Sequence, residues 1–317
     1  MSAAQKAQCF HSFAANRQLC LPANTHLVFL GESTMRFQYL LLAWALLHQI
    51  EYRDRDLDPA DPRRLHSIAS FSKGGVNESK EWSAFLNYSN AVLHPYEHCD
   101  CMRHNSRPRE SATIAHRSHI ENRYFHFGSV RLTYLTCMGR NAHHGVWWPG
   151  DADSLRTVHP AGTPWRWELP NASSVVTRLL PILRPTHVVY FVGGVHLRMQ
   201  QAHAHKHRYA AGRGPLGPLT DEELRAFNAS FRAAGLEGVS LACISRMGLN
   251  DGSVSWAVQK DENVRKHCGQ TLDLYPIMRN WGRDAFHDYI HYNDYANGIL
   301  LANLLTSLFP QRPGRAP

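Results

Sequence analysis

The chain has 317 residues, and 44% of them are hydrophobic. This length and composition allow one large domain or two ordinary ones with a substantial core, and they argue against a disordered chain. The formal net charge is +8 with the 21 histidines counted as neutral. Such a charge suits an acidic polysaccharide, a nucleic acid or an anionic lipid surface, and a basic surface that is merely solvated explains it equally well.

The longest apolar run, Tyr39 to Leu47, is much shorter than the roughly 20 residues that a membrane-spanning helix needs. We therefore predict no membrane span within this chain. The first residues, MSAAQKAQCF, show no apolar core of the signal-peptide type. Glycosylation triplets of the type Asn-x-Ser nevertheless occur at Asn77, Asn87, Asn171 and Asn228, and they favour the lumen of the secretory pathway (the Golgi) or the cell exterior.

In chain order, the hydrophobic patterns predict alternating strands and helices. They are a strand at 26–30, a helix at 34–49, strands and helices in turn at 130–136, 171–183, 186–192, 220–234, 239–244 and 258–267, a short strand at 271–275, and a final helix at 293–308. Residues 1–23 are interpreted as an irregular N-terminal extension. A single domain is expected over 24–317, with loop insertions around 51–125 and 200–219. Buried strands separated by helices predict an α/β fold, with a mostly parallel central sheet and helices on both sides.

The first buried strand ends at Gly31-Glu32-Ser33, and the helix that follows contains Arg36 and Gln38. Function in such sheets gathers at the carboxyl ends of the strands. Ser33 stands at one such end, and Gly193-Gly194 stands at another. Ser33 is therefore a candidate nucleophile. The alternative is an ordinary strand-to-helix turn in which the Ser33 side chain merely caps the helix.

A serine nucleophile needs a histidine base, and the histidine needs an orienting acid. Two overlapping Asp-x-x-His units occur near the C-terminus: Asp284 with His287, and Asp288 with His291. With this spacing, a carboxylate in a short turn can reach the imidazole Nδ1–H of its own histidine. The second unit directly precedes the final predicted helix, which would anchor the turn.

These two blocks, Gly31-Glu32-Ser33 with Arg36 and Gln38 and a late Asp-x-x-His before a terminal helix, resemble the SGNH (GDSL-type) hydrolase superfamily. The closest branch is the PC-esterase group, which includes trichome-birefringence-like and sialic acid O-acetyltransferases. The resemblance implies an SGNH-hydrolase-like, flavodoxin-like three-layer sandwich. It also implies a triad in which Ser33 attacks an acyl carbonyl, His291 is the base and Asp288 orients it. Asp284 and His287 are the alternative catalytic pair.

The resemblance assigns further residues to the oxyanion or the substrate: Gly139, Gly194, His196 and Arg36. Arg36 either braces the site or binds an acidic substrate group. Two positions depart from the family pattern, because Glu32 stands where aspartate is usual and His196 stands where an asparagine donates to the oxyanion.

Two function hypotheses follow. The first is a serine-dependent acyl (O-acetyl) esterase or acyltransferase that acts on an O-acylated polysaccharide or glycoconjugate, without cofactor, metal or nucleic acid. The second is a catalytically inactive glycan-binding module on the same fold, which the departures at Glu32 and His196 favour. The alternating His203, His205 and His207 are interpreted as solvated loop histidines.

Overall fold

The structure is a computed structural model that describes residues 6–53, 93, 96–100, 122–136, 146–148, 167–169, 172–192, 221–246, 261–281, 285 and 292–310. Within these ranges the strands are β1 (Gln8–Ser12), β2 (Arg17–Leu21), β3 (His26–Gly31), β4 (Glu97–Asp100), β5 (Asn122–Phe127), β6 (Val130–Thr136), β7 (Val146–Trp148), β8 (Trp167–Leu169), β9 (His187–Phe191), β10 (Ser240–Arg246) and β11 (Gln270–Asp273). The helices are α1 (Ser33–His48), α3 (Ala172–Arg178), α4 (Leu180–Leu183), α6 (Asp221–Ala233), α7 (Asp261–His267), α8 (Tyr275–Met278) and α9 (Asp294–Leu308).

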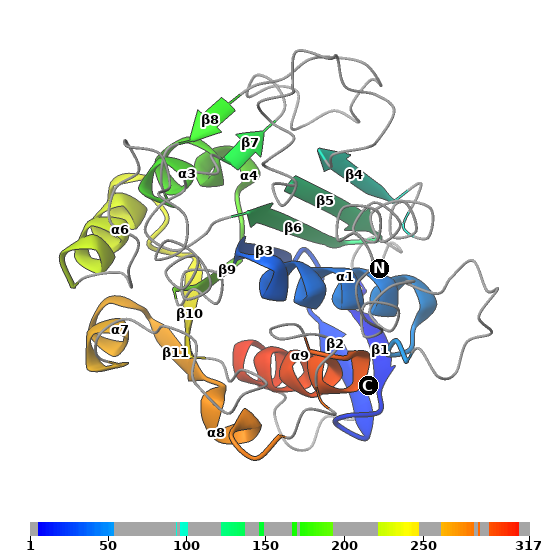
Figure 1. Ribbon diagram of the computed structural model, residues 1–317. Helices are drawn as coiled ribbons and strands as arrows, with labels where there is room; N and C mark the ends of the chain where they lie inside the picture. The colour runs from blue at the N-terminus through cyan, green and yellow to red at the C-terminus, as the bar shows by residue number, and fades with distance from the viewer. Residues whose placement is uncertain are drawn as a thin grey trace, which may run out of the picture.

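The predicted α/β fold with a mostly parallel sheet is confirmed. Seven strands pair in the order β11-β10-β9-β3-β6-β5-β4 (Figure 1). The strands from β11 to β6 are all parallel, whereas β5 and β4 complete the other edge in antiparallel pairing. β3 lies inside this sheet, where Val28 pairs with Val188 of β9 and with Thr133 of β6.

The sheet separates two hydrophobic cores. On one face, Phe29, Val189 and Ile244 pack with α1 and α9. On the other, Val28 and Val188 pack with residues of α3, α4, α6 and α7. Every residue of β3 is buried, which explains why its sequence is continuously apolar rather than alternating.

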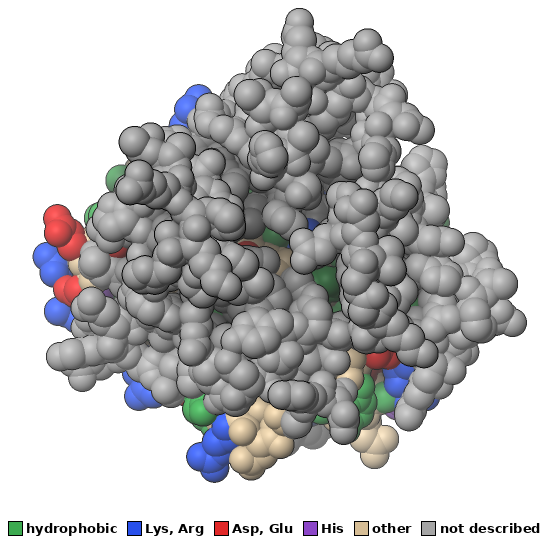
Figure 2. All heavy atoms as spheres, viewed as in Figure 1, with side chains coloured by type: hydrophobic (Ala, Val, Ile, Leu, Met, Phe, Trp, Pro, Cys, Tyr) green, Lys and Arg blue, Asp and Glu red, His purple; other side chains and the backbone are tan. Residues whose placement is uncertain are grey.

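Helix α6 shows the amphipathic pattern of a helix that covers a sheet. Leu224, Phe227 and Phe231 are buried, while acidic and basic side chains lie side by side on its outer surface (Figure 2). Asp221 in its first turn accepts hydrogen bonds from Arg225 at 2.7 Å and from His267 of α7 at 2.8 Å. The bond from Arg225, followed by that from His267, lowers the pKa of Asp221.

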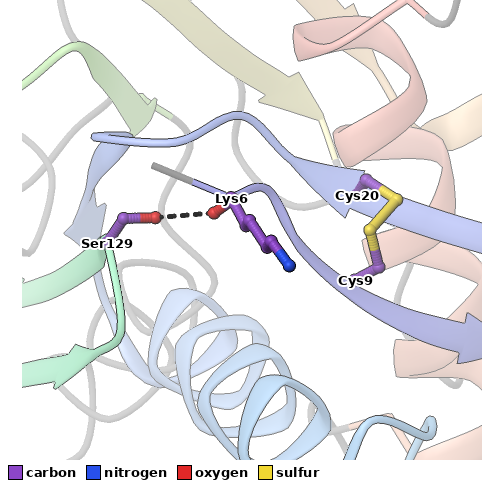
Figure 3. The surroundings of a disulfide bond; sticks show 4 residues. All are labelled: Lys6, Cys9, Cys20 and Ser129. Atoms are coloured by element: carbon purple, nitrogen blue, oxygen red, sulfur yellow. Dashed lines mark hydrogen bonds between the residues drawn. A yellow bond between two sulfur atoms is a disulfide. The ribbon is translucent and has the colours of Figure 1, made fainter. Parts of the chain in front are cut away.

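The expectation of an irregular N-terminal extension is wrong for residues 8–21. β1 and β2 form an antiparallel hairpin in which Cys9 lies opposite Cys20 and is bonded to it (Figure 3). Ser129 Oγ donates to the Lys6 carbonyl at 2.9 Å and holds the start of this hairpin (Figure 3). Phe10, Leu19 and Leu21 are buried in the same core as α1 and α9, so the hairpin is part of the domain.

The predicted helix at 171–183 is two helices, α3 and α4, with Leu179 between them. Pro181 explains the break, because proline has no N–H and its ring clashes with the carbonyl four residues earlier.

A second disulfide joins Cys243 of β10 to Cys268, which follows α7. In the part of the chain that the structure describes, no helix has both the length and the apolar character to cross a bilayer.

Candidate active site

Ser33 lies at the junction where β3 ends and α1 begins. Glu32 occupies the N-cap position with extended backbone and makes no capping bond with its side chain. The N–H groups of Met35 and Arg36 donate to the Glu32 carbonyl at 2.9 and 3.2 Å. Ser33 is therefore the first residue inside the helix, and the alternative in which its side chain caps the helix is wrong.

Gly31 makes this junction possible. Its φ is +157°, and a Cβ atom there would lie 3.1 Å from Phe191 Cβ and closer still to the Met35 side chain. The Tyr134 hydroxyl donates to the Gly31 carbonyl at 3.2 Å and fixes the end of the strand from the other side. The turn therefore requires glycine for its backbone angle and for lack of space.

The order of the strands places this junction where α/β proteins bind ligands. After β3 the chain forms β4, β5 and β6 on one side, with β6 next to β3, and then returns to add β9, β10 and β11 on the other. In doubly wound sheets, ligands bind beyond the carboxyl ends of the strands at the point where the strand order reverses. Here that point lies between β3 and β9, and Ser33 follows the carboxyl end of β3 directly.

The first two turns of α1 bury an unusual number of polar side chains. Glu32, Arg36 and Gln38 are all at most 2% exposed, and Ser33 is 7% exposed. The Arg36 guanidinium carbon lies 5.3 Å from the centre of the Phe37 ring. Buried polar groups cost free energy unless they are hydrogen-bonded, so this polar end of an otherwise apolar helix indicates a specific role.

Helix α9 lies beside α1 (Figure 1), and a chain of buried hydrogen bonds joins the two. Gln38 Nε2 donates to Asn297 Oδ1 at 2.7 Å, and Asn297 Nδ2 donates to the Tyr292 carbonyl at 2.8 Å. Gln38 and Asn297 are each within the first two turns of their helices, so the N-termini of α1 and α9 lie at the same end.

The residues that precede α9 are held at both ends. Asn293 is the N-cap of α9, and its side chain accepts from the Ala296 N–H at 2.9 Å. Its own N–H donates to the Ala285 carbonyl at 2.9 Å. Tyr292 is buried against Trp281, with ring centres 5.9 Å apart, and burial raises the pKa of the Tyr292 hydroxyl. The ends of the segment between Ala285 and Asn293 are therefore held next to each other.

Of the predicted site residues, the structure describes Ser33 and Arg36, both in the first turn of α1. The others lie outside the described residues: Gly139, Gly194, His196, Asp284, His287, Asp288 and His291. The same holds for His203, His205 and His207. No group of three or more metal-ligating side chains occurs within the described ranges.

Two residues at the start of α9 were not singled out by the sequence. Asn297 is a buried amide in the largely apolar helix α9. Its hydrogen bond with Gln38 explains how a polar side chain can be buried there. Tyr295, in the first turn of α9, is 63% exposed. An aromatic ring so exposed is available for contact with a ligand.

No protein-family model, curated protein or solved structure matches this chain. The fold and the residues around Ser33 are therefore the basis for the function proposed below.

Proposed function

We propose that the protein is a serine-dependent acyl esterase or O-acyltransferase of the SGNH type that acts on an O-acylated glycan, with O-acetyl as the favoured group. Ser33 is the nucleophile, His291 the base and Asp288 its orienting acid. The observation that supports this most is that Ser33 lies at the point where the strand order of the sheet reverses, while hydrogen bonds connect α1 to Tyr292. Tyr292 directly follows His291 in the sequence.

The strand order supports the SGNH-type fold. Numbered along the chain, the parallel strands β3, β6, β9, β10 and β11 lie in the spatial order 2-1-3-4-5, which is the flavodoxin-like order. Hydrophobic cores with helices lie on both faces of the sheet. We infer from these features the three-layer sandwich that the resemblance implies.

The proposed reaction proceeds through an acyl-enzyme. Ser33 Oγ attacks the acyl carbonyl while His291 takes the hydroxyl proton, and a tetrahedral oxyanion forms. Collapse of this intermediate breaks the bond to the leaving oxygen, which receives the proton from His291. Water or a sugar hydroxyl then attacks the acyl-enzyme by the same route in reverse, which gives hydrolysis or transfer.

The oxyanion needs donors that are in place before the reaction. The Ser33 N–H lies at the N-terminus of α1, where the helix dipole favours negative charge. Gly139, Gly194 and His196 are proposed to complete the site, with His196 donating in place of the usual asparagine. Each donor of this kind contributes about 3–4 kcal/mol to transition-state stabilisation.

A glycan substrate and an oxidising compartment each have their own support. The exposed Tyr295 ring offers a surface on which the apolar face of a sugar can stack. The disulfides Cys9–Cys20 and Cys243–Cys268, both within the described residues, suit the secretory lumen or the cell exterior, where such bonds persist.

Labelling with a fluorophosphonate probe tests the proposal. The wild-type protein should label at Ser33, and Ser33→Ala should abolish labelling, whereas Ser307→Ala in the last turn of α9 should label normally. Release of acetate from acetylated xylan, pectin or sialic acids should follow the same pattern. His291→Ala should lower turnover far more than His287→Ala. The reverse order would transfer the role of base to the pair Asp284 and His287.

The second candidate is a glycan-binding module without catalysis. Glu32 favours it, because this buried carboxylate is longer than the usual aspartate and stands next to the nucleophile. A protein that binds acetylated glycans but neither labels nor releases acetate would establish this second function in place of the first.

A further inference from the structure

We infer that Gln38 and Asn297 form a positioning pair that holds the start of α9, and the Tyr292 backbone that follows the proposed base His291, against α1, whose first residue is Ser33. This inference rests on the proposed function, and it assigns a role to two residues that do not touch the reacting atoms. Among the described residues, the pair is a direct hydrogen-bonded link between the helix that begins at the nucleophile and the residue that follows the proposed base.

The pair occupies a place where apolar side chains would pack equally well. Gln38 is 2% exposed and Asn297 is 1% exposed, and the same two helices contribute buried leucines such as Leu40 and Leu301 to one hydrophobic core. Helices that meet through leucine alone can slide or rotate at little cost. The pair favours the alignment in which Gln38 Nε2 and both ends of the Asn297 amide are bonded, because any other leaves these groups without those partners; Gln38 Oε1 is buried without a hydrogen bond to any described residue in this alignment too.

The two bonds of Asn297 have different consequences. Its Oδ1 accepts from Gln38 Nε2 at 2.7 Å, which joins α9 to α1. Its Nδ2 donates to the Tyr292 carbonyl at 2.8 Å, which holds the backbone immediately after His291. The first bond therefore fixes α9 against α1, and the second fixes the Tyr292 backbone relative to α9.

Ser33 and Gln38 are separated by about 7.5 Å along the axis of α1, at about 1.5 Å per residue. That is short enough for a shift at Gln38 to alter the distance between the nucleophile and its base. A displacement of about 1 Å in a catalytic group costs about 100-fold in rate. We therefore expect loss of the pair to lower turnover while substrate affinity stays nearly constant.

The test uses two variants that remove one bond each. In its ionised form Asn297→Asp keeps the acceptor for Gln38 but cannot donate to the Tyr292 carbonyl, and Gln38→Met keeps the side-chain length but not the donor. Asn303→Asp is the matched control, because Asn303 is exposed on the same helix and donates to the Ile299 carbonyl of its own helix. The readouts are the rate of fluorophosphonate labelling between pH 5 and 9, kcat, KM and the melting temperature.

We expect Asn297→Asp and Gln38→Met to label about 10- to 100-fold more slowly at temperatures well below melting. KM should change less than threefold, and the control should match the wild type. The pH midpoint of labelling should shift in Gln38→Met, which adds no titratable group, since the environment of the base changes, whereas a purely structural role would leave it in place.

Each outcome decides a different question. If the wild type labels at Ser33 but the variants label at the wild-type rate and only melt earlier, the positioning role is overturned and the proposed function stands. If the wild type does not label, the proposed function is overturned and this inference with it. Should Gln38→Met fail to fold, Asn297→Asp alone still separates the two results.

Discussion

Gly31 and Phe191 face each other across the neighbouring strands β3 and β9, with room for no side chain between them. A Cβ atom on Gly31 would lie 3.1 Å from Phe191 Cβ, and the Met35 side chain closes the remaining space. This contact brings the first turn of α1 directly onto the end of the strand. The position of Ser33 therefore depends on the absence of a side chain two residues earlier.

Replacing Gly31 with alanine should lower the free energy of unfolding by about 2–4 kcal/mol, because the new methyl group meets Met35 and Phe191 and the backbone angle is unfavourable. Urea unfolding of the purified variant measures this change. Gly238→Ala is the matched control, since nothing lies within 4 Å of the corresponding Cβ position. Equal losses in both variants would contradict the tight contact at Gly31.

His26 should make the protein sensitive to acid. It is fully buried at the start of β3, where Nδ1–H donates to the Leu183 carbonyl and Nε2 accepts from the Thr133 hydroxyl, both at 2.8 Å. Burial, with the nearby charge of Arg131, lowers the pKa of His26 from 6.5 to about 3. The folded protein therefore holds a neutral imidazole that becomes protonated in the unfolded chain below pH 6.5.

Because the unfolded state binds the extra proton, this contribution to stability is complete above pH 6.5 and is lost as the pH falls toward 3. We expect a loss of about 1.4 kcal/mol per pH unit from this group alone within that window. His26→Leu should be less stable at neutral pH and should show a shallower decline in acid. The free energy of unfolding of both proteins is measured with urea at each pH. If it falls equally with pH in the wild type and in His26→Leu, His26 is not the cause of the acid sensitivity.

The hairpin disulfide should stabilise the fold without taking part in the chemistry. Cys9 and Cys20 close a short loop whose Phe10, Leu19 and Leu21 are buried against α1 and α9. Loss of the bond in Cys9→Ser/Cys20→Ser should cost about 3 kcal/mol. The melting temperature should fall, while the labelling rate of Ser33 at low temperature stays at the wild-type value. A labelling rate that fell with stability would instead tie the hairpin to the site.

Tyr295 should contribute to substrate binding and not to the chemical step. Tyr295→Ala removes the ring that is 63% exposed in the first turn of α9, and KM for an acetylated glycan should rise about 3- to 10-fold. Labelling by the small fluorophosphonate should not change, because the probe has no sugar ring. Tyr96→Ala, which removes an exposed ring next to β4, serves as the control for a nonspecific loss of aromatic surface. An unchanged KM would exclude Tyr295 as a glycan contact.

The central strands and the two helices of the site could be predicted because their signal is local. β3 and β9 are short runs of mostly apolar residues, β6 alternates and is rich in β-branched and aromatic residues, and the predicted bounds agree with the structure to within a residue or two. The turn at Gly31 and the N-terminus of α1 were also evident, since the pattern changes there from strand to helix. The location of Ser33 at this change could be predicted, but its position as the first residue inside the helix could not.

The antiparallel edge could not be predicted in the same way. β5 contains Arg123, which is fully buried, and β4 contains Glu97, which is 5% exposed. Arg123 Nη1 donates to Glu97 Oε2 at 2.8 Å, and the Tyr39 hydroxyl donates to Glu97 Oε1 at 2.9 Å. A charged residue in an isolated segment indicates a surface, and only its partner on another element allows it to be buried.

The sequence by itself determined which segments are buried and where the chain turns from strand to helix, because those properties depend on neighbours within one window of residues. Only the tertiary structure decided that α9 lies against α1, that Gln38 bonds to Asn297, and that residues 8–21 form a hairpin on the same core. These contacts join residues far apart in the chain. Their free energy depends on the mutual fit of two surfaces, which the pattern of either segment alone does not contain.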